Sequence, residues 1–495
     1  MTASLEENTM KQRRMSARVS APGTRACRLL TVAALTGTLC SAACGQPLPA
    51  FPTAEGFGAV ASGGRGGAVY HVTNLDDGGP GSLRHGIGTA VGPTTIVFEV
   101  GGSIELNAPL TINRSDLTIA GQTAPGGIAI TGHETRIESA SDVIIRYMSM
   151  RTGDRNIGPG AGDSLRIVNA DRIIVDHVST AWGLDETLSV TRSNNITVQH
   201  SIIAETLNPA NHAFGSLVRG NIDAANQGGY TFHHNLWIHN DRRNPALGSY
   251  QEEDKDADLE IELVNNVIVN WGTRSIHTVE SRDPLRINLI NNMFIAGPST
   301  SSGTVNEVLR AEIFQQGVNV YESGNLIDSD QDAAHDPEAV TRSMFRESLF
   351  ADISFVGEPF TLSDIEDEDT AIAYDRVLQS AGASLHRDAV DERLIQDVVD
   401  RTGAIIVSQD EVGGYPVIVG GVAPVDTDRD GMPDGWETSL GLDPDDAADG
   451  PGIAFNGYTN LENYLNTLSG DLSIPEPATL ALLAWGAIAP LLRRR

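Results

Sequence analysis

The sequence Ile261-Glu-Leu-Val-Asn-Asn266 is followed by a close copy, Ile287-Asn-Leu-Ile-Asn-Asn292. In both, a short run with apolar residues at alternate positions, as in a β-strand, ends in asparagine. Similar runs lie at residues 143–147, 173–177, 196–200, 230–235 and 318–325, and all but the first of these end in His or Asn. The step from one run to the next is about 23 to 35 residues, which is a typical period for a solenoid.

This repetition predicts an all-β chain folded as a parallel β-helix. One coil cannot bury its apolar face alone, whereas stacked coils share a continuous core. The asparagines that end the last four runs would then stack as a ladder in which each amide satisfies backbone groups of its neighbour. These are Asn235, Asn266, Asn292 and Asn325. The alternative, a β-sandwich, predicts strands every 8 to 12 residues or so and hairpin dipeptides, and these are scarce.

The composition limits the chemistry that the chain can perform. The 495 residues carry a net charge of −31, and the only lysines are Lys11 and Lys255, so nearly all positive charge is arginine. This balance excludes nucleic-acid binding by counterion release, and a polyanionic substrate would have to be held by local cations. The cysteines Cys27, Cys40 and Cys44 all lie near the N-terminus, so we expect no disulfide framework and no thiolate chemistry.

Both ends of the chain carry patterns typical of export. Residues 1–46 combine a basic segment, a short apolar run and small residues, which predicts a secretory signal peptide. Residues 472–495 contain Pro-Glu-Pro, an apolar run and three arginines, and resemble the PEP-CTERM sorting signal of bacteria; a tail anchor is the alternative. We therefore expect a bacterial protein that export and sorting machinery delivers outside the cell or to its surface, and we expect it to be a monomer.

Between these ends we expect two units. Residues 47–420 form the β-helix domain, with a helical segment over 371–402 that breaks near Gly382 and packs on the solenoid. Residues 424–468 form a small EF-hand-like calcium module, because acidic residues alternate in a loop where Gly431 permits a sharp turn. Its predicted ligands are Asp426, Asp428, Asp430, Asp434 and Glu437.

A second group of acids lies in the centre of the chain. Asp163 follows a glycine-rich loop, and Asp185 and Glu186 follow the next repeat. Loops of neighbouring coils stack in a solenoid, so these side chains are expected to meet, and clustered carboxylates favour a hard cation such as Ca²⁺. Asp176, by contrast, lies within a strand pattern, and we expect it to have a structural role.

Residues 51 to about 325, and in part to 416, resemble the pectate lyases of the β-helix class. The resemblance rests on several motifs together: Ala54-Glu-Gly-Phe-Gly58, Gly79-Pro-Gly-Ser-Leu83, Ala120-Gly-Gln-Thr-Ala-Pro125, Val175-Asp-His177, Trp182-Gly-Leu-Asp-Glu186, Asn235-Leu-Trp, Arg243-Asn-Pro245 and Asn266 through Asn-Trp-Gly272. It implies a right-handed parallel β-helix and lyase activity for residues 47–420.

The resemblance also implies roles for individual residues. Asp163 and Asp185 would bind calcium, and Arg243 would be the catalytic base. Related enzymes often carry another acidic ligand four residues after the one at Asp185; Ser189 stands there, so Glu186 would substitute. They also often carry a substrate-binding lysine, and the chain has none in that region, which leaves His212 or Arg219. A second arginine of the family falls at Gly248, and Arg242 would compensate.

The implied reaction is β-elimination on polygalacturonate or pectin, which yields 4,5-unsaturated oligogalacturonides. Because free arginine stays protonated up to about pH 12, we expect activity to rise well above neutral pH and to be lost with a chelator. Three alternatives remain at this point. They are a β-helix glycoside hydrolase acting on a uronate polysaccharide through paired carboxylates, a non-catalytic matrix or adhesion protein, and a lyase acting on methyl-esterified pectin.

Overall fold

The computed structural model describes residues 47–156, 162–208, 212–220, 229–250, 259–281, 284–312, 317–349, 351–360, 363–366 and 368–472. The predicted signal peptide, the glycine-rich run at 157–161 and all but the first residue of the predicted sorting tail lie outside these residues. In the part of the chain that the structure describes, no helix combines the length and the apolar character needed to cross a bilayer.

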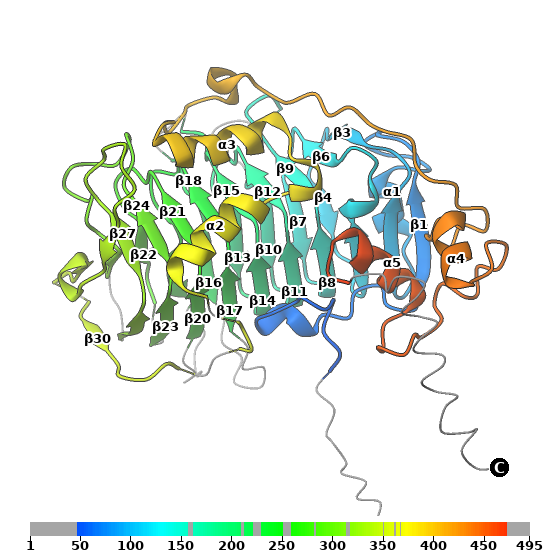
Figure 1. Ribbon diagram of the computed structural model, residues 1–495. Helices are drawn as coiled ribbons and strands as arrows, with labels where there is room; N and C mark the ends of the chain where they lie inside the picture. The colour runs from blue at the N-terminus through cyan, green and yellow to red at the C-terminus, as the bar shows by residue number, and fades with distance from the viewer. Residues whose placement is uncertain are drawn as a thin grey trace, which may run out of the picture. The chain divides into compact units, whose positions relative to one another are not determined.

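Three long sheets make up the fold, and from β2 to β27 each strand pairs with the strand three places along the chain (Figure 1). The first sheet contains β1 (Ala68–Val72), β2 (Thr94–Phe98), β5 (Leu117–Ala120), β8 (Ser141–Arg146), β11 (Asp171–Asp176), β14 (Asn194–Gln199), β17 (Tyr230–His233), β20 (Leu259–Val264), β23 (Leu285–Ile290), β26 (Val318–Ser323) and β30 (Ile353–Phe355). This eleven-stranded sheet carries the sequence runs in which the repeat was visible.

The other two sheets are built from shorter strands. The nine-stranded sheet contains β4 (Leu110–Ile112), β7 (Thr135–Glu138), β10 (Leu165–Val168), β13 (Leu188–Thr191), β16 (Leu217–Gly220), β19 (Ala246–Ser249), β22 (Ile276–Thr278), β25 (Leu309–Arg310) and β29 (Phe345–Arg346). The ten-stranded sheet contains β3 (Gly102–Glu105), β6 (Ile128–Thr131), β9 (Ser149–Arg151), β12 (Ser179–Ala181), β15 (Ile202–Ala204), β18 (Leu236–Ile238), β21 (Val267–Val269), β24 (Met293–Ile295), β27 (Leu326–Asp328) and β28 (Glu338–Ala339).

Among the strands of the described residues, those of successive coils run parallel, and β27 and β28 form the one antiparallel pair of strands. Three parallel sheets visited in turn define a parallel β-helix, and its connections take the right-handed sense of parallel crossovers. Inward-facing Val, Ile and Leu side chains from all three sheets form one continuous buried core. Leu83 and Ile87 of the short helix α1 (Leu83–Thr89) add to that core. The predicted fold class is confirmed.

The predicted asparagine ladder is present just after the carboxyl ends of the strands of the eleven-stranded sheet. Asn235 Nδ2 donates to Asn266 Oδ1 at 3.1 Å, Asn266 Nδ2 donates to Asn292 Oδ1 at 3.0 Å, and Asn292 Nδ2 donates to Asn325 Oδ1 at 2.9 Å. The same carbonyl oxygens also accept backbone N–H groups of the preceding coil. Each buried turn is thus satisfied by side chains, which fixes the stacking of the coils.

The predicted helical segment forms α2 (Thr370–Ser380) and α3 (Ala389–Asp400), which lie over the ten-stranded sheet (Figure 1). Val377, Leu394 and Val398 pack there against outward-facing residues of β12 to β24. Gly382 separates the two helices, and a Cβ atom there would lie 2.5 Å from Ser179 Oγ. Glycine is therefore required where the chain turns against the sheet.

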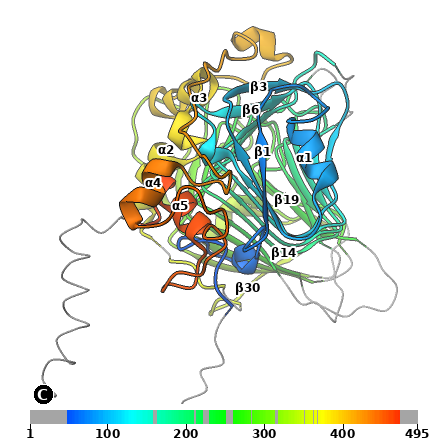
Figure 2. The same cartoon turned by 90° about the vertical axis from the view of Figure 1, so that its right-hand side faces the viewer.

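The last described segment contains α4 (Asp434–Leu440) and α5 (Asn460–Leu468), which lie near β1 (Figure 2). Leu461, Tyr464 and Leu465 of α5 share a small core with Ala120 of β5, and Val69 of β1 packs against it. Short 3-10 helices complete the described structure: η1 (Phe57–Val60), η2 (Gly121–Thr123), η3 (Arg342–Met344), η4 (Ser384–His386) and η5 (Gln409–Val412).

Candidate functional site

The nine-stranded sheet positions the predicted site, because the loops that precede its strands stack on one another. Asp163 lies just before β10, Glu186 just before β13 and Arg242 just before β19. Isolated parallel bridges join Glu186 to Phe214 and Phe214 to Arg242, so the three coils are in register at this point. Residues that are far apart in the sequence thereby line one short row on the surface of the sheet.

Three predicted metal ligands meet in this row. Each of Asp163, Asp185 and Glu186 offers a carboxylate oxygen within 4.8 Å of the others. Asp163 and Glu186 are buried, whereas the side chain of Asp185 is 42% exposed and gives the cluster an open side. The main-chain N–H of Glu186 donates to Asp163 Oδ1 at 3.1 Å, and the Ser189 hydroxyl donates to Asp163 Oδ2.

The electrostatics of the cluster are those of acids crowded into a confined site. Burial raises the pKa of Asp163 to about 7, and the charges of Glu134 and Asp185 act in the same direction. Burial and then the charge of Asp163 raise the pKa of Glu186 well above its usual range. A hard cation would relieve both effects, and an all-oxygen donor set suits calcium. The residues present therefore fit a calcium ion.

Two arginines and a histidine from the following coils lie next to the acids. Arg243 Nη1 donates to Glu186 Oε1, and the guanidinium lies 4.0 Å from the centre of the Phe214 ring. Arg242 lies over the same ring at 4.5 Å. The ring of His212 contacts Phe214 and pairs with Asp185 through Nε2. The structure thus brings Arg242, Arg243 and His212 together with the acids.

Arg219 is the predicted site residue that lies apart from this cluster. It is on β16, where its Nε donates to the carbonyl of Ser249 at 3.1 Å and its guanidinium lies 4.2 Å from the ring of Tyr250. It is in register with Gly248 of β19, further along the strand than the acids. Arg219 shares the face of the sheet with the cluster but contacts none of the three carboxylates in the hydrogen bonds and ion pairs of the described residues.

The row extends into a groove of about 520 Å³ on the side of Arg242. Arg242, Arg274 and Arg310 line it together with one acid, Asp241, with Asn208, and with the hydroxyl residues Thr273, Ser301 and Thr304. Arg274 pairs with Glu312 at 2.7 Å, and Arg310 pairs with Glu307. In an acidic protein, three arginines on one groove offer local positive charge for an anionic ligand.

Sequence reasoning missed several residues of this region. Glu134 precedes β7, and the N–H of Asp163 lies 3.5 Å from its Oε1, so a fourth carboxylate borders the cluster. Phe214, Arg274 and Arg310 were also not foreseen. Arg310 is on β25, whereas Phe214 and Arg274 precede β16 and β22. These strands are only two to four residues long, too short to show a period, so only the register of the coils would have pointed to these residues.

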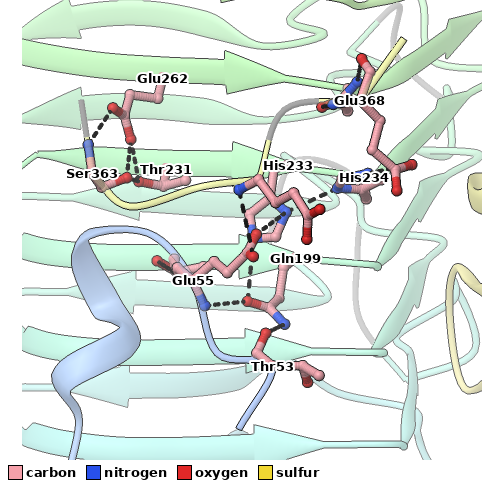
Figure 3. Close-up of polar contacts among 12 residues, drawn as sticks. Thr53, Glu55, Gln199, Thr231, His233, His234, Glu262, Ser363 and Glu368 are labelled. Carbon is pink, nitrogen blue, oxygen red and sulfur yellow. Dashed lines mark hydrogen bonds and ion pairs between the residues drawn. The ribbon is translucent and has the colours of Figure 1, made fainter. Parts of the chain in front are cut away.

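A second group of titratable side chains lies at the carboxyl ends of two strands of the eleven-stranded sheet, β14 and β17. His200, His233 and His234 each offer a ring nitrogen within 4.8 Å of the others. His233 also faces Gln199 and Glu55, and His234 faces Glu368 (Figure 3). Tyr147, His177, His200 and His234 stack ring on ring through successive coils. Asp176 is bound there by Arg146 and His177, which agrees with the structural role expected for it.

The predicted calcium loop lies in the segment that carries α4 and α5. Asp426, Asp428 and Asp430 form one group of oxygen donors, and Asp430 forms a second group with Glu437 and Asp449. Asp434 belongs to neither of these groups. Its carboxylate accepts the N–H and the hydroxyl of Thr427, both at 2.8 Å.

No protein-family model matches the chain. A probable pectate lyase C of Aspergillus flavus is 36% identical over 429 residues, which cover 85% of this chain and 94% of that protein. A probable pectate lyase C of Neosartorya fischeri is 38% identical over 430 residues, with the same coverage. Among solved structures, Jun a 1, the major allergen from cedar pollen, aligns with a TM-score of 0.48 and 18% identity over 66% of this chain and 92% of that one.

Proposed function

This chain belongs to the pectate lyase family and is a polysaccharide lyase, and on that premise we propose that it cleaves polygalacturonate by calcium-assisted β-elimination. The observation that carries the proposal is the contact between Arg243 and the carboxylate cluster. It joins a candidate base and a candidate cation site in one row of the nine-stranded sheet. The products would be 4,5-unsaturated oligogalacturonides.

Asp163, Asp185 and Glu186 would hold the calcium ion. Burial and mutual repulsion disfavour three free carboxylates in this place, and Asp185 leaves the site open to a carboxylate of the substrate. When bound, the ion would neutralise the acids and stabilise negative charge that develops on the substrate carboxylate. Ser189 keeps one oxygen of Asp163 in place but adds no charge.

Arg243 would take the proton from C5 of a galacturonate residue. That proton is weakly acidic because it lies α to a carboxylate. As the C5–H electron pair forms the C4–C5 double bond, the C4–O bond breaks and the leaving oxygen takes up a proton. The proposal requires Arg243 to leave Glu186, which a cation bound to Glu186 would favour.

Arg242, His212 and Arg219 would bind the polymer. Arg242 opens into the arginine-lined groove, so it would hold a uronate carboxylate next to the reacting residue. His212 lies on the exposed side of Asp185, and Arg219 lies further along the sheet. The inverting hydrolase alternative requires carboxyl groups roughly 6.5–9.5 Å apart, whereas oxygens of these three acids lie within 4.8 Å of one another.

The test is the ultraviolet absorbance of unsaturated uronides when the protein is incubated with polygalacturonate, with calcium or with a chelator. We expect signal growth only with calcium, and a loss of about 10²-fold or more in the Arg243→Ala variant, as for removal of a general base. Arg342→Ala is a matched control, because Arg342 also lies over a phenylalanine ring, that of Phe355, but far along the chain. Full activity of Arg243→Ala, with loss in Arg242→Ala instead, would assign the base to Arg242. Reducing ends without absorbance would exclude the lyase mechanism.

We also propose that the protein acts outside the cell as a monomer. The support for the location is the pair of terminal export patterns, which lie outside the described residues, apart from Leu472 at the start of the tail. Detection of the processed protein in the culture medium, or at the cell surface, checks the location; retention of the unprocessed chain inside the cell would contradict it. Light scattering checks the oligomeric state.

A further inference from the structure

The segment that carries α4 and α5 holds a cluster of five acids, and its geometry differs from the pattern expected from the sequence. Asp430 is shared by the two groups of oxygen donors, which makes them one continuous set of five residues: Asp426, Asp428, Asp430, Glu437 and Asp449. Asp449 comes from the loop between α4 and α5, outside the motif. We call this set the C-terminal acid cluster.

The three aspartates of the loop are each fixed by the backbone. Asp426 accepts the N–H of Arg429 at 2.7 Å and that of Gly431 at 3.0 Å. Asp428 and Asp430 each accept, with one carboxylate oxygen, a hydrogen bond from the backbone N–H two residues further along the chain. These bonds hold the carboxylates in place, but they leave the other oxygens of Asp428 and Asp430 free.

The free oxygens indicate that a ligand is required. The side chain of Glu437 is fully buried, and neither of its carboxylate oxygens has a hydrogen-bond partner. One oxygen each of Asp428, Asp430 and Asp449 is also buried without a partner. Leaving a buried carboxylate unsatisfied is costly, and here five such oxygens belong to one cluster. A bound cation would satisfy them together.

The loop that carries Asp449 is shaped to reach this cluster. Asp449 Oδ2 accepts the N–H of Asp443 at 2.9 Å, while its Oδ1 is one of the free oxygens. A Cβ atom at Gly450 would lie 2.4 Å from Asp430 Oδ2. Glycine is therefore needed where this loop passes the carboxylates.

We propose that the C-terminal acid cluster binds a calcium ion, with Asp449 as a ligand in place of Asp434, and that the ion clamps the C-terminal segment onto the first coils of the β-helix. An oxygen-only donor set matches calcium. The carboxylate of Asp434 stays on Thr427 and braces the loop.

The contacts of the loop explain how calcium binding would strengthen the attachment of the C-terminal segment to the β-helix. Met432 lies between the ligands Asp430 and Glu437 and is fully buried against Ala120 and α5. The carbonyl of Arg429 lies 3.0 Å from His71 Nε2 on β1. Further along, Glu462 pairs with Arg65 at 2.7 Å, and Asp471 pairs with the buried Arg146 at 2.9 Å. If the loop loosens without its ion, it no longer holds Met432 in this small apolar core, which lies beside these ion pairs.

The test uses the full chain and measures protection of the C-terminal segment from limited proteolysis as calcium is titrated against a chelator. We expect calcium to protect the wild type. Glu437→Gln and Asp449→Asn should each need at least ~10-fold more calcium, whereas the matched control Asp434→Asn should need nearly the wild-type concentration. Asp163→Asn, at the other cluster, should protect normally, which separates this site from the proposed catalytic one.

Three outcomes overturn the proposal. The first is that calcium does not protect the wild type. The second is that calcium protects Glu437→Gln, Asp449→Asn and the wild type equally. The third is normal protection in Asp449→Asn with loss in Asp434→Asn, which would restore the ligand set expected from the motif. A folding defect does not confuse the result, because Glu437→Gln removes charge repulsion and should leave the calcium-free protein at least as stable as the wild type.

Discussion

At the scale of single residues, the site depends on acids held where they are unfavourable without a cation. Asp163 is the clearest case, because it is buried against Glu134, Asp185 and Glu186, and among the described residues its carboxylate accepts hydrogen bonds only from one hydroxyl and one backbone N–H. A residue in this environment can stabilise the fold only when something compensates its charge. The same residue should therefore have opposite effects on stability with and without calcium.

This argument predicts a pH-dependent effect of Asp163→Asn in chelator. The pKa of Asp163 rises from 3.8 to about 7 on folding, so the stability it contributes is present below about pH 4 and lost as the pH rises through 7. In chelator, thermal melts should show Asp163→Asn more stable than the wild type at pH 8 and no longer so at pH 4. In calcium at pH 8 the order should reverse. Asp185→Asn, at the exposed edge, is the control with a small effect in chelator. A wild type that melts above Asp163→Asn in chelator at pH 8 would contradict the argument.

Residues also mark the limit of prediction from sequence. Asp163, Asp185 and Glu186 were foreseen as neighbours because stacked loops bring consecutive coils together, and the structure places them so. Asp449 was not foreseen, since no motif fixes its spacing from the loop, and Asp434 occupies a motif position while its side chain bonds Thr427. A sequence motif specifies the backbone position of a side chain, whereas the surrounding residues determine its direction.

At the scale of elements, the eleven-stranded sheet was visible in the sequence because seven of its strands, from β8 to β26, form similar runs, and six of these runs end in His or Asn. The positions before the ladder, Tyr147, His177, His200, His234 and Asn265, all have positive φ, which few residue types other than glycine and asparagine adopt readily. Each coil in this part of the sheet contributes one residue to the stack, to the ladder or to both. The nine-stranded sheet has no such marker, so Glu134, Arg274 and Arg310 could not be assigned to the site from sequence.

The histidine stack predicts an acid sensitivity that belongs to this sheet. Burial lowers the pKa of His234 to about 4, so the stability of the neutral ring is present above about pH 6.5 and lost as the pH falls toward 4. The equivalent residue of the next coil is Asn265. In the His234→Asn variant, the loss of unfolding free energy on acidification should therefore be smaller than in the wild type by about 2–3 kcal/mol. Urea unfolding at pH 7 and pH 4.5 measures it, and His386→Asn, at an exposed histidine, should change nothing.

Glu55 acts in the opposite sense at the same place, and the comparison must allow for it. Burial raises its pKa to about 7, so its contribution to stability is lost as the pH rises. The difference between His234→Asn and the wild type isolates the histidine, because both proteins keep Glu55. An identical pH dependence in the two proteins would show that the stack is not the source of acid sensitivity.

At the scale of the whole molecule, the charge of the chain opposes its proposed substrate. The net charge is −31, and polygalacturonate is a polyanion, so long-range repulsion slows their encounter. The arginines that line the groove, Arg242, Arg274 and Arg310, act only at short range and are partly neutralised by acidic partners. Repulsion over long distances and attraction at the groove should respond differently to salt.

This contrast predicts that kcat/KM rises with ionic strength before it falls. Raising NaCl from about 10 to 100 mM shortens the screening length from about 30 to 10 Å, which removes the long-range repulsion while the contacts of the groove persist. We expect a few-fold rise at constant free calcium, and Arg274→Ala should raise KM at every salt concentration without abolishing the rise. Initial rates of absorbance growth measure both. A steady fall from the lowest salt upward would mean that the arginines of the groove, and not the net charge, govern the approach of the polymer.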